Sequence, residues 1–401
     1  MAICAALLQC SVAHASDQKN VGSLDAQFRT FYFDRDRAGA EPSSTAFTQA
    51  LMLRYRSPYF KDVFSINLSG FGNLKFQGDD GEGGTGLLID EPNGEQSSYS
   101  KVGEVYAKFK LPDNGGIDVG RFQINTPLLN DSDNRGTPST TQAALFKINT
   151  NIANFYGLIS DRASAKTEDD FGEYMDSNGD SFNVYAFGAD REFENSLYLH
   201  GAIGQADNVL QQIYLNARYQ TSFGNNYSVM FDGYQYFGEA DGQGALAGVG
   251  PDYSSDITSL VARISRGNAK FSVAYQKING DEYQFSWDNK VHDDNDVKTW
   301  FVVQQMKFIR AEEESWQARI DYDFDQYIPG FTAMARYTSG DNIRRDDGTK
   351  GSEWESNLDL LYRPPALENL SFQWRYSVVR SSETIDNEEN RFIVNWHVRG
   401  F

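Results

Sequence analysis

Apolar and polar residues alternate along most of the chain from about residue 23 onward. Near the start, Leu24 and Phe28 alternate with Asp25 and Arg29, and residues 370–378 repeat the pattern near the end. This alternation is typical of β-strands with one apolar face and one polar face. Several alternating segments approach ~9–11 residues, the length that a tilted strand needs to cross a bilayer. The pattern therefore predicts an all-β protein whose strands can span a membrane.

The breaks between these segments alternate between short and long. Short breaks lie near residues 57–61, 112–116, 149–151, 190–195, 222–226, 265–268, 325–330 and 364–369. Longer breaks lie near residues 34–44, 77–99, 123–140, 160–181, 238–252, 279–313, 340–352 and 380–390, and one brief break near residues 206–208 takes the place of a long one. Outer-membrane barrels have short periplasmic turns and long external loops. We therefore predict a transmembrane antiparallel β-barrel of about 18 strands with both termini in the periplasm.

Aromatic residues at the ends of segments favour this barrel over a soluble β-sandwich. Examples are Phe31, Tyr32, Phe33, Tyr234, Tyr236, Phe237, Tyr362 and Trp396. Aromatic girdles at the two membrane interfaces would explain them. An open sheet edge in lipid would leave backbone groups unpaired, so we expect residues 391–401 to pair with the segment near Leu24. The C-terminal Phe401 looks like the signal that the outer-membrane assembly machinery recognises.

Residues 1–15 form a short apolar run that ends in Ala13-His14-Ala15. Small residues at both ends of this triplet predict the cleavage site of a secretory signal peptide. The run lacks the basic start of a signal peptide, which would follow if the N-terminus were truncated or its start residue wrongly assigned. Residues 16–401 would then form a single barrel domain. The mean hydropathy is -0.55, and no later stretch reaches the ~20 consecutive apolar residues of a membrane helix.

Composition excludes several other classes of protein. The 56 acidic residues outnumber the 36 basic ones, and a formal charge of -20 argues against nucleic-acid binding. Both cysteines lie within residues 1–15, which leaves the mature chain without thiol ligands. The remaining histidines, His200, His292 and His397, are far apart in sequence. We therefore predict no metal site and no cofactor.

Basic residues occupy many polar positions of the alternating segments. If the apolar positions face lipid, the cations that face inward are Arg29, Arg54, Lys108, Arg218, Arg263, Arg319, Arg336 and Arg375. Glu104, Asp321, Asp323 and Asp359 would share the interior. Each cation could simply pair with a nearby carboxylate in a hydrated lumen. Together they predict a basic lumen wall that attracts anions, because rings of charged side chains set the selectivity of pores.

Residues 120–138, with the sequence GRFQINTPLLNDSDNRGTP, resemble the third external loop of the OprD family of substrate-specific porins. Segments that begin at Ser315, Glu353, Asn369 and Glu389 resemble the same family. The resemblance implies an eighteen-stranded barrel that acts as a monomer, with a ladder of arginines along one wall. It also implies that the third loop, residues 123–140, folds into the lumen as the constriction.

The family places a polar residue and then an arginine at the narrowest point of the channel, which implies that Asn134 and Arg135 form the pore constriction. The opposing acidic side would come from another loop, within residues 279–313, whose individual carboxylates the resemblance does not assign.

These observations predict a substrate-selective outer-membrane porin of a Gram-negative bacterium. We expect passive diffusion of small hydrophilic nutrients, first of all carboxylate-bearing solutes such as amino acids or organic acids. Oligosaccharides such as chito-oligosaccharides are the alternative, given the aromatic content. An outer-membrane enzyme is a weaker hypothesis, because the phase of the pattern turns His200 toward the lumen and away from the lipid-facing wall that a barrel lipase would use. Expected partners are outer-membrane lipid, lipopolysaccharide and the barrel-assembly machinery.

Overall fold

A computed structural model describes residues 21–39, 42–79, 84–112, 114–224, 226–244, 246, 248–288 and 295–400. The predicted signal peptide at residues 1–15 and the C-terminal Phe401 lie outside the described residues, so the predicted division of the chain stays a prediction. Within the described residues, no helix has the length and apolar character that crossing a membrane requires.

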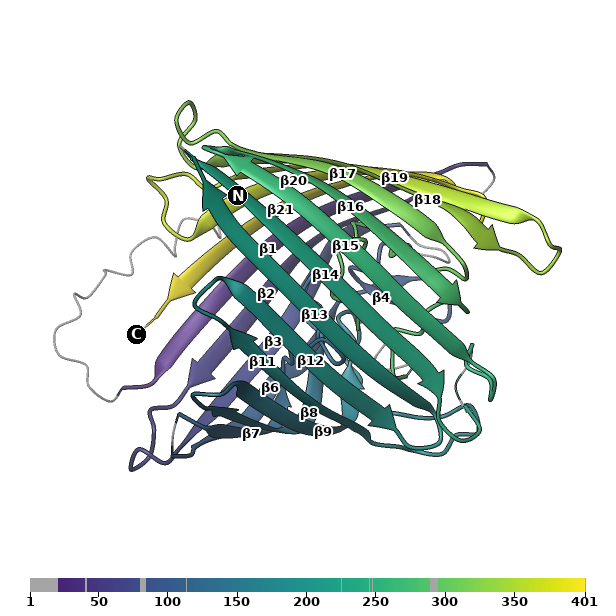
Figure 1. Cartoon of the computed structure of the whole chain (residues 1–401). Helices are drawn as coiled ribbons and strands as arrows, with labels where there is room; N and C mark the ends of the chain where they lie inside the picture. Colours follow the sequence, from purple (N-terminus) through teal and green to yellow (C-terminus); the bar gives the residue numbers. More distant parts are fainter. Residues whose placement is uncertain are drawn as a thin grey trace.

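The described residues form a closed antiparallel β-barrel of 18 strands, and one short strand is added to the same sheet. Figure 1 shows the tilted strands that surround the barrel interior. The barrel strands are β1 (Ser23–Arg37), β2 (Ser44–Arg56), β3 (Phe64–Gly78), β6 (Tyr99–Lys110), β7 (Gly116–Phe122), β8 (Thr140–Asn149), β9 (Asn154–Ser164), β11 (Val184–Glu192), β12 (Leu197–Ala206), β13 (Leu210–Phe223), β14 (Tyr227–Ala240), β15 (Ser254–Arg266), β16 (Ala269–Gly280), β17 (Glu314–Asp323), β18 (Phe331–Arg344), β19 (Lys350–Tyr362), β20 (Leu370–Ser381) and β21 (Asn387–Arg399). The predicted fold class and strand number are confirmed.

Three short strands lie in the external loops. Strands β4 (Ile89–Asp90) and β5 (Gln96–Ser97) pair with each other in the loop after β3. Strand β10 (Gly172–Glu173) adds to β9. These additions shape the loops and leave the order of the barrel strands unchanged.

The first and last strands close the sheet. β1 pairs with β2 on one side and with β21 on the other, in a register that runs from Asp25 opposite Arg399 to Arg37 opposite Asn387. Closure gives the edge strands a hydrogen-bonding partner, which a sheet in lipid requires because lipid offers none. The predicted pairing of the last segment with the first is therefore confirmed.

Three predicted loops are shorter than the sequence suggested. The connections around residues 34–44, 340–352 and 380–390 are reduced to 38–43, 345–349 and 382–386, because the flanking strands extend further. The physical reason is that backbone pairing does not require apolar side chains, so a ladder continues beyond the membrane through polar residues. Two of these extensions carry Arg35 and Glu389 into the barrel wall.

The aromatic girdle was only partly predicted. Tyr32, Phe237, Tyr362 and Trp396 lie on the outward side of their strands, whereas Phe31, Phe33, Tyr234 and Tyr236 lie on the inward side. Neighbouring residues of a strand face opposite ways, so a run of consecutive aromatics cannot lie wholly in the girdle. Phe33 and Tyr236 are fully buried inside the barrel, while Trp396 stays 43% exposed on the outside.

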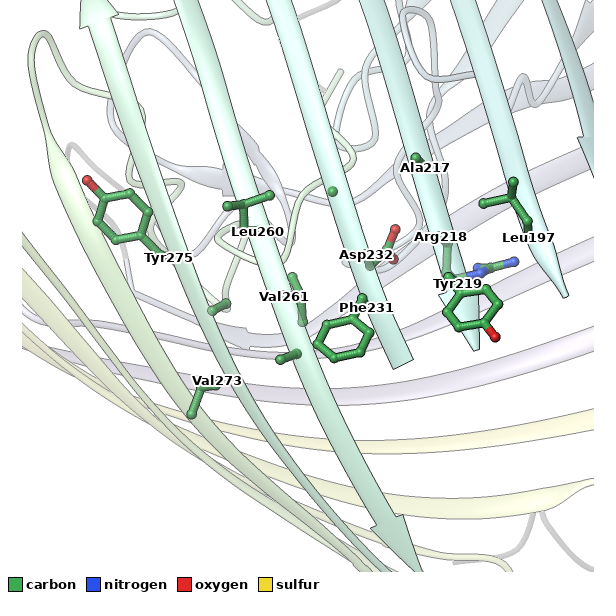
Figure 2. A pocket seen from close by; sticks show the side chains of 13 residues that line it. Leu197, Ala217, Arg218, Tyr219, Phe231, Asp232, Leu260, Val261, Val273 and Tyr275 are labelled. Carbon is green, nitrogen blue, oxygen red and sulfur yellow. The ribbon is translucent and has the colours of Figure 1, made fainter. Parts of the chain in front are cut away.

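The outer wall of strands β13–β16 illustrates the two faces of the sheet. Tyr219, Phe231 and Leu260 line an apolar groove on the outside, and Phe231 is 54% exposed. Arg218 and Asp232 occupy the intervening positions, and Figure 2 labels both sets of side chains. Apolar outward and polar inward positions are what a strand between lipid and a wet lumen requires.

A hydrophobic core lies inside the barrel, between the wall and the loops that fold into the lumen. The third external loop, residues 123–139, folds into the lumen and packs Leu128 and Leu129 against Trp287 and Ile309 of the loop between β16 and β17. Gly204 on the wall makes room for them, since a Cβ there would lie 2.9 Å from the Trp287 ring and 3.1 Å from Leu128. The barrel wall and the two loops therefore form one packed unit.

Trp287→Ala should loosen the third loop without unfolding the barrel. The Trp287 ring is fully buried and its Nε1 donates to the Leu128 carbonyl at 2.6 Å. Loss of a buried aromatic side chain removes about 3–5 kcal/mol of packing. We expect larger and noisier single-channel currents in planar bilayers.

Trp316→Ala is the matched control, because Trp316 lies on the outer face and is 48% exposed. It should conduct like the parent protein. If Trp287→Ala keeps the heat-resistant gel mobility of a folded barrel and also conducts like the parent, this packing does not hold the loop in place.

Candidate functional site

The third loop is tied to the barrel wall by a buried arginine. Arg29 on β1 donates from Nη1 to Asp133 Oδ1 at 2.7 Å and to the carbonyl of Arg135 at 2.6 Å. Its Nε donates to Asn395 Oδ1 on β21 at 2.9 Å. A bidentate charged pair with an added backbone bond fixes both position and orientation. Arg29 was predicted as part of the lumen wall, and it serves here to hold the loop.

The loop between β16 and β17, residues 281–313, holds the third loop from the other side. The side-chain oxygen of Asn295 accepts hydrogen bonds from the backbone N–H and the side-chain amide of Asn130, at 2.9 and 2.8 Å. Lys298 Nζ donates to Asn130 Oδ1 at 2.9 Å and to Asn125 Oδ1 at 2.8 Å. The predicted partner segment, residues 279–313, therefore does contact the third loop.

A buried carboxylate fixes the far end of the 281–313 loop. Glu355 on β19 accepts backbone N–H bonds from Gln304 at 3.1 Å, Gln305 at 3.2 Å and Met306 at 2.9 Å. Consecutive N–H groups pointing at one carboxylate form an anion-binding concavity. The loop thus uses its own backbone to neutralise a wall charge.

Three arginines surround one phenylalanine where the loops meet the wall. The guanidinium carbons of Arg35, Arg135 and Arg391 lie 5.2, 5.5 and 4.9 Å from the centre of the Phe33 ring. Glu389 pairs with Arg35 at 2.6 Å and with Arg391 at 2.5 Å. The face of an aromatic ring attracts cations, so Phe33 and Glu389 together gather the three positive charges.

Arg135 differs from the other two arginines because it has no carboxylate partner among the described residues. Its Nη1 donates to the carbonyl of Asn134 at 3.3 Å, and its buried Nε has no hydrogen-bond partner. Burial, with a smaller contribution from Arg391, lowers the pKa of Arg135 to about 9, so the side chain stays cationic at neutral pH. Arg135 is therefore the arginine of this group that forms no ion pair within the described residues.

These residues line a cavity of about 480 Å³ on the external side of the third loop. Its cationic lining residues are Arg35, Arg37, Arg135, Lys166, Lys307, Arg310 and Arg391. Its carboxylate lining residues are Glu282, Asp296 and Glu353. We call this cavity the external vestibule. With seven cations against three carboxylates among the described residues, it has an excess of positive charge.

Two of the three vestibule carboxylates, Glu282 and Asp296, come from the 281–313 loop. Asp296 pairs with Lys307 at 2.8 Å, and Glu282 lies 3.7 Å from Arg310. Arg310 also pairs with Glu353 of β19 at 2.9 Å. The vestibule therefore contains paired charges along one side and the unpaired Arg135 on the other.

Several of the predicted wall cations pair with carboxylates. Arg319 pairs with Asp321 at 2.6 Å, and Arg375 pairs with Asp359 at 3.2 Å. The Arg54–Glu104 and Lys108–Asp118 pairs are looser, at 4.0 and 3.9 Å. Such pairs neutralise much of the positive charge that the sequence alone suggested.

Besides Arg29, which pairs with Asp133 of the third loop, the remaining wall cations have no carboxylate partner within the described residues; these are Arg218, Arg263 and Arg336. Arg336 donates to Asn357 Oδ1 at 2.8 Å, and Arg263 donates to Ser272 Oγ at 3.0 Å. Arg263 also lies 4.5 Å from the centre of the Trp300 ring, and Arg218 lies 4.9 Å from that of Tyr198. The predicted cations occur on strands around much of the barrel.

Sequence reasoning missed Arg35, Arg391 and Glu389. Residues 34–44 and 380–390 were interpreted as loops, which removed Arg35 and Glu389 from the wall. The signal was present, because Arg35 continues the alternating phase of Arg29 and Phe33. Their convergence around Phe33 required the strand register, since Arg35 pairs with Glu389 across β1 and β21.

A closed barrel with loops folded into its lumen and a charged cavity beside the third loop has the architecture of an outer-membrane channel. A family model described as outer membrane porin, OprD family, matches residues 20–399, and the chain belongs to this family. The family and localisation predicted from residues 120–138 are confirmed. Because the family consists of channels, the prediction that the protein is not an enzyme is also confirmed.

Similar proteins come from Pseudomonas. Porin D of Pseudomonas aeruginosa is 28% identical over 444 aligned positions, which cover 99% of this chain and 97% of that protein. The crystal structure of OccK9 (OpdG) from the same species superposes with a TM-score of 0.86 at 25% identity, covering 94% of this chain and 98% of that one. OpdK of P. aeruginosa, crystallised with vanillate, has a TM-score of 0.84 at 22% identity and covers 95% and 100%.

Asp131 gives the third loop a titratable carboxylate that accepts hydrogen bonds. Its carboxylate accepts the Ile124 N–H at 2.7 Å and the Thr141 hydroxyl at 3.1 Å. Burial raises the pKa of Asp131 to about 6. The unfolded group titrates near its usual value of about 4. At a pH between these two pKa values, Asp131 keeps its proton in the folded loop and releases it in the unfolded loop.

The stabilisation from this proton is therefore full below about pH 4 and is lost as the pH rises through about 6. Fluctuations of the single-channel current should increase between pH 4 and pH 7, and Asp131→Asn should flatten this dependence. Asp207→Asn, on the exposed turn after β12, serves as the control and should keep the parent's pH profile. A pH profile for Asp131→Asn that equals the parent's would remove Asp131 from this role.

Proposed function

We propose that this porin selects small hydrophilic solutes that carry a carboxylate group, such as amino acids or organic acids. The observation that carries the proposal is the external vestibule, with its excess of cations and an Arg135 that no carboxylate of the described residues neutralises. Guanidinium groups match the geometry of a carboxylate and bind it with paired hydrogen bonds. A solute would enter the vestibule because its charge is attracted there.

Arg135 and Asn134 would form the constriction itself. Arg135 belongs to the third loop, and its neighbours Arg35 and Arg391 belong to the wall, so a carboxylate that leaves one guanidinium meets another within reach. Conduction requires binding that is favourable enough for entry and weak enough for release. A series of cations spaced around Phe33 meets this requirement, and the predicted wall cations Arg336 and Arg263 would continue the path.

Oligosaccharides are the alternative substrate class. They would bind by stacking on aromatic rings and would not need the excess of cations that the vestibule contains. The paired and unpaired arginines around Phe33 therefore favour carboxylates over neutral sugars at this end of the channel. A comparison of charged and neutral solutes at the vestibule separates the two classes.

The membrane partners form a second part of the proposal. Outward apolar residues contact lipid, as in any porin barrel. We infer further that the outer leaflet contributes lipopolysaccharide, that the assembly machinery recognises the last strand, and that a signal peptide at residues 1–15 directs export in a Gram-negative cell. The closed barrel of one chain fits a monomer.

Arg135→Ala should reduce the preference of the channel for anions. Removal of one screened charge at the constriction should change the anion-to-cation permeability ratio by about three- to tenfold. Reversal potentials across a salt gradient in planar bilayers measure this ratio. Block of the current by vanillate, used as a carboxylate probe, should weaken in parallel.

Arg363→Ala is the matched control, since Arg363 lies exposed on the turn after β19. It should leave both the permeability ratio and the block unchanged. The carboxylate proposal fails if Arg135→Ala keeps the parent's ratio, or if a neutral chito-oligosaccharide blocks the parent channel more strongly than vanillate does and Arg135→Ala abolishes that block.

A further inference from the structure

A second cavity of about 530 Å³ lies on the periplasmic side of the third loop. The third loop contributes residues 123 and 125–127 to the lining. The other lining residues belong to strands β6–β9, β11 and β12. We call it the periplasmic cavity. Because the external vestibule involves residues 134 and 135 of the same loop, a solute that passes the loop would encounter the two cavities in succession.

Six ring-bearing side chains line the periplasmic cavity among its charged and polar residues: Tyr106, Phe122, Phe155, Tyr156, Tyr198 and His200. The rings of Tyr106 and Phe122 are 5.1 Å apart, inclined at 40°. The His200 ring lies 6.0 Å from Tyr156 and 6.1 Å from Tyr198, each in an edge-to-face arrangement. The two ring nitrogens of His200 face the hydroxyl groups of these tyrosines, at 3.4 and 3.3 Å. The result is a set of rings held in place by one another.

Polar groups without partners surround these rings. Within the described residues, the side chains of Gln123, Lys147 and Asn149 and the hydroxyl of Tyr106 make no hydrogen bond. Amide groups and hydroxyl groups both donate and accept hydrogen bonds, so they can bind hydroxyl groups of a solute in either direction. A pocket lined by aromatic surface with a few convergent polar groups is the usual form of a small-molecule site.

The charge of the periplasmic cavity also differs from that of the external vestibule. Its formal cations are Lys108 and Lys147, and its carboxylates are Glu104, Asp118 and Asp190. Lys108 is close to Asp118, at 3.9 Å, and Asp190 accepts a hydrogen bond from Asn154 at 3.1 Å. This nearly balanced set gives no reason for an anion to stay there.

We propose that the periplasmic cavity is a second solute-binding site, which takes neutral rings that carry hydroxyl groups. The face of such a ring would stack on Tyr106 or Tyr198, and its hydroxyl groups would bond to Gln123, Asn149 and the Tyr106 hydroxyl. Sugars and phenolic rings share this chemistry. The site does not depend on the carboxylate selectivity proposed for the external vestibule, because it uses other residues and no net charge.

Single-channel recordings in planar bilayers test the site with two neutral probes, N-acetylglucosamine and 4-hydroxybenzyl alcohol, each added to one side at a time. We expect reversible interruptions of the current that occur more often from one side. Tyr106→Leu removes a stacking ring and should weaken the block about tenfold. Tyr106→Phe keeps the ring and removes one hydroxyl, so it should weaken the block by about two- to tenfold.

Two controls isolate the periplasmic cavity. Tyr185→Leu changes a tyrosine on the outer face of β11 that is 41% exposed. The neutral probes should block this variant as strongly as they block the parent. Arg135→Ala should also leave the block by neutral probes unchanged, even where it alters anion selectivity. Heat-resistant gel mobility and the conductance in plain salt show that each variant is folded.

Each outcome decides the question. Block by either probe that Tyr106→Leu weakens supports the site, and the stronger probe then shows whether sugars or phenols are preferred. The proposal is overturned if neither probe interrupts the current, or if Tyr106→Leu is blocked as strongly as the parent. Loss of the neutral-probe block in Arg135→Ala would also overturn it, because binding would then belong to the external vestibule.

Discussion

The hydrogen bonding of the backbone in lipid is the constraint on which this structure depends. Lipid offers no partner for a free N–H or C=O group, so the sheet closes by pairing β1 with β21, from Asp25 opposite Arg399 to Arg37 opposite Asn387. Closure around 18 strands leaves an interior wider than side chains alone can fill. The third loop and the 281–313 loop occupy that space, and the channel exists between them and the wall.

The two inner loops are held by different forces on their two sides. Toward strands β12–β14 they pack an apolar core around Leu128 and Trp287, which excludes water from that part of the lumen. Toward β19–β21 they bind buried carboxylates, with Glu355 accepting backbone N–H groups and Glu389 pairing with arginines. A buried carboxylate is stable only when such partners surround it. The arginines and backbone N–H groups that stabilise Glu355 and Glu389 therefore gather on the β19–β21 side of the lumen.

The chemistry of the channel changes along its length for this reason. Arginines gathered by Phe33 and Glu389 make the external vestibule cationic, whereas the periplasmic cavity on the other side of the third loop has aromatic and polar walls and almost balanced charge. Charge acts over several ångströms and attracts a solute before contact, while stacking acts only on contact. The two cavities therefore offer a solute different interactions, first with charged groups and then with rings and uncharged polar groups.

The alternation of the sequence determined the strand number, the closed barrel and the positions of the external loops, because strand periodicity is local and repeats at every second residue. It also placed Arg29, Arg263 and Arg336 on polar faces. Only the tertiary structure decided that Arg35, Arg135 and Arg391 meet at Phe33, since these residues come from separate segments that the barrel register and a folded loop bring together. Contacts between distant segments depend on that register, which no local pattern contains.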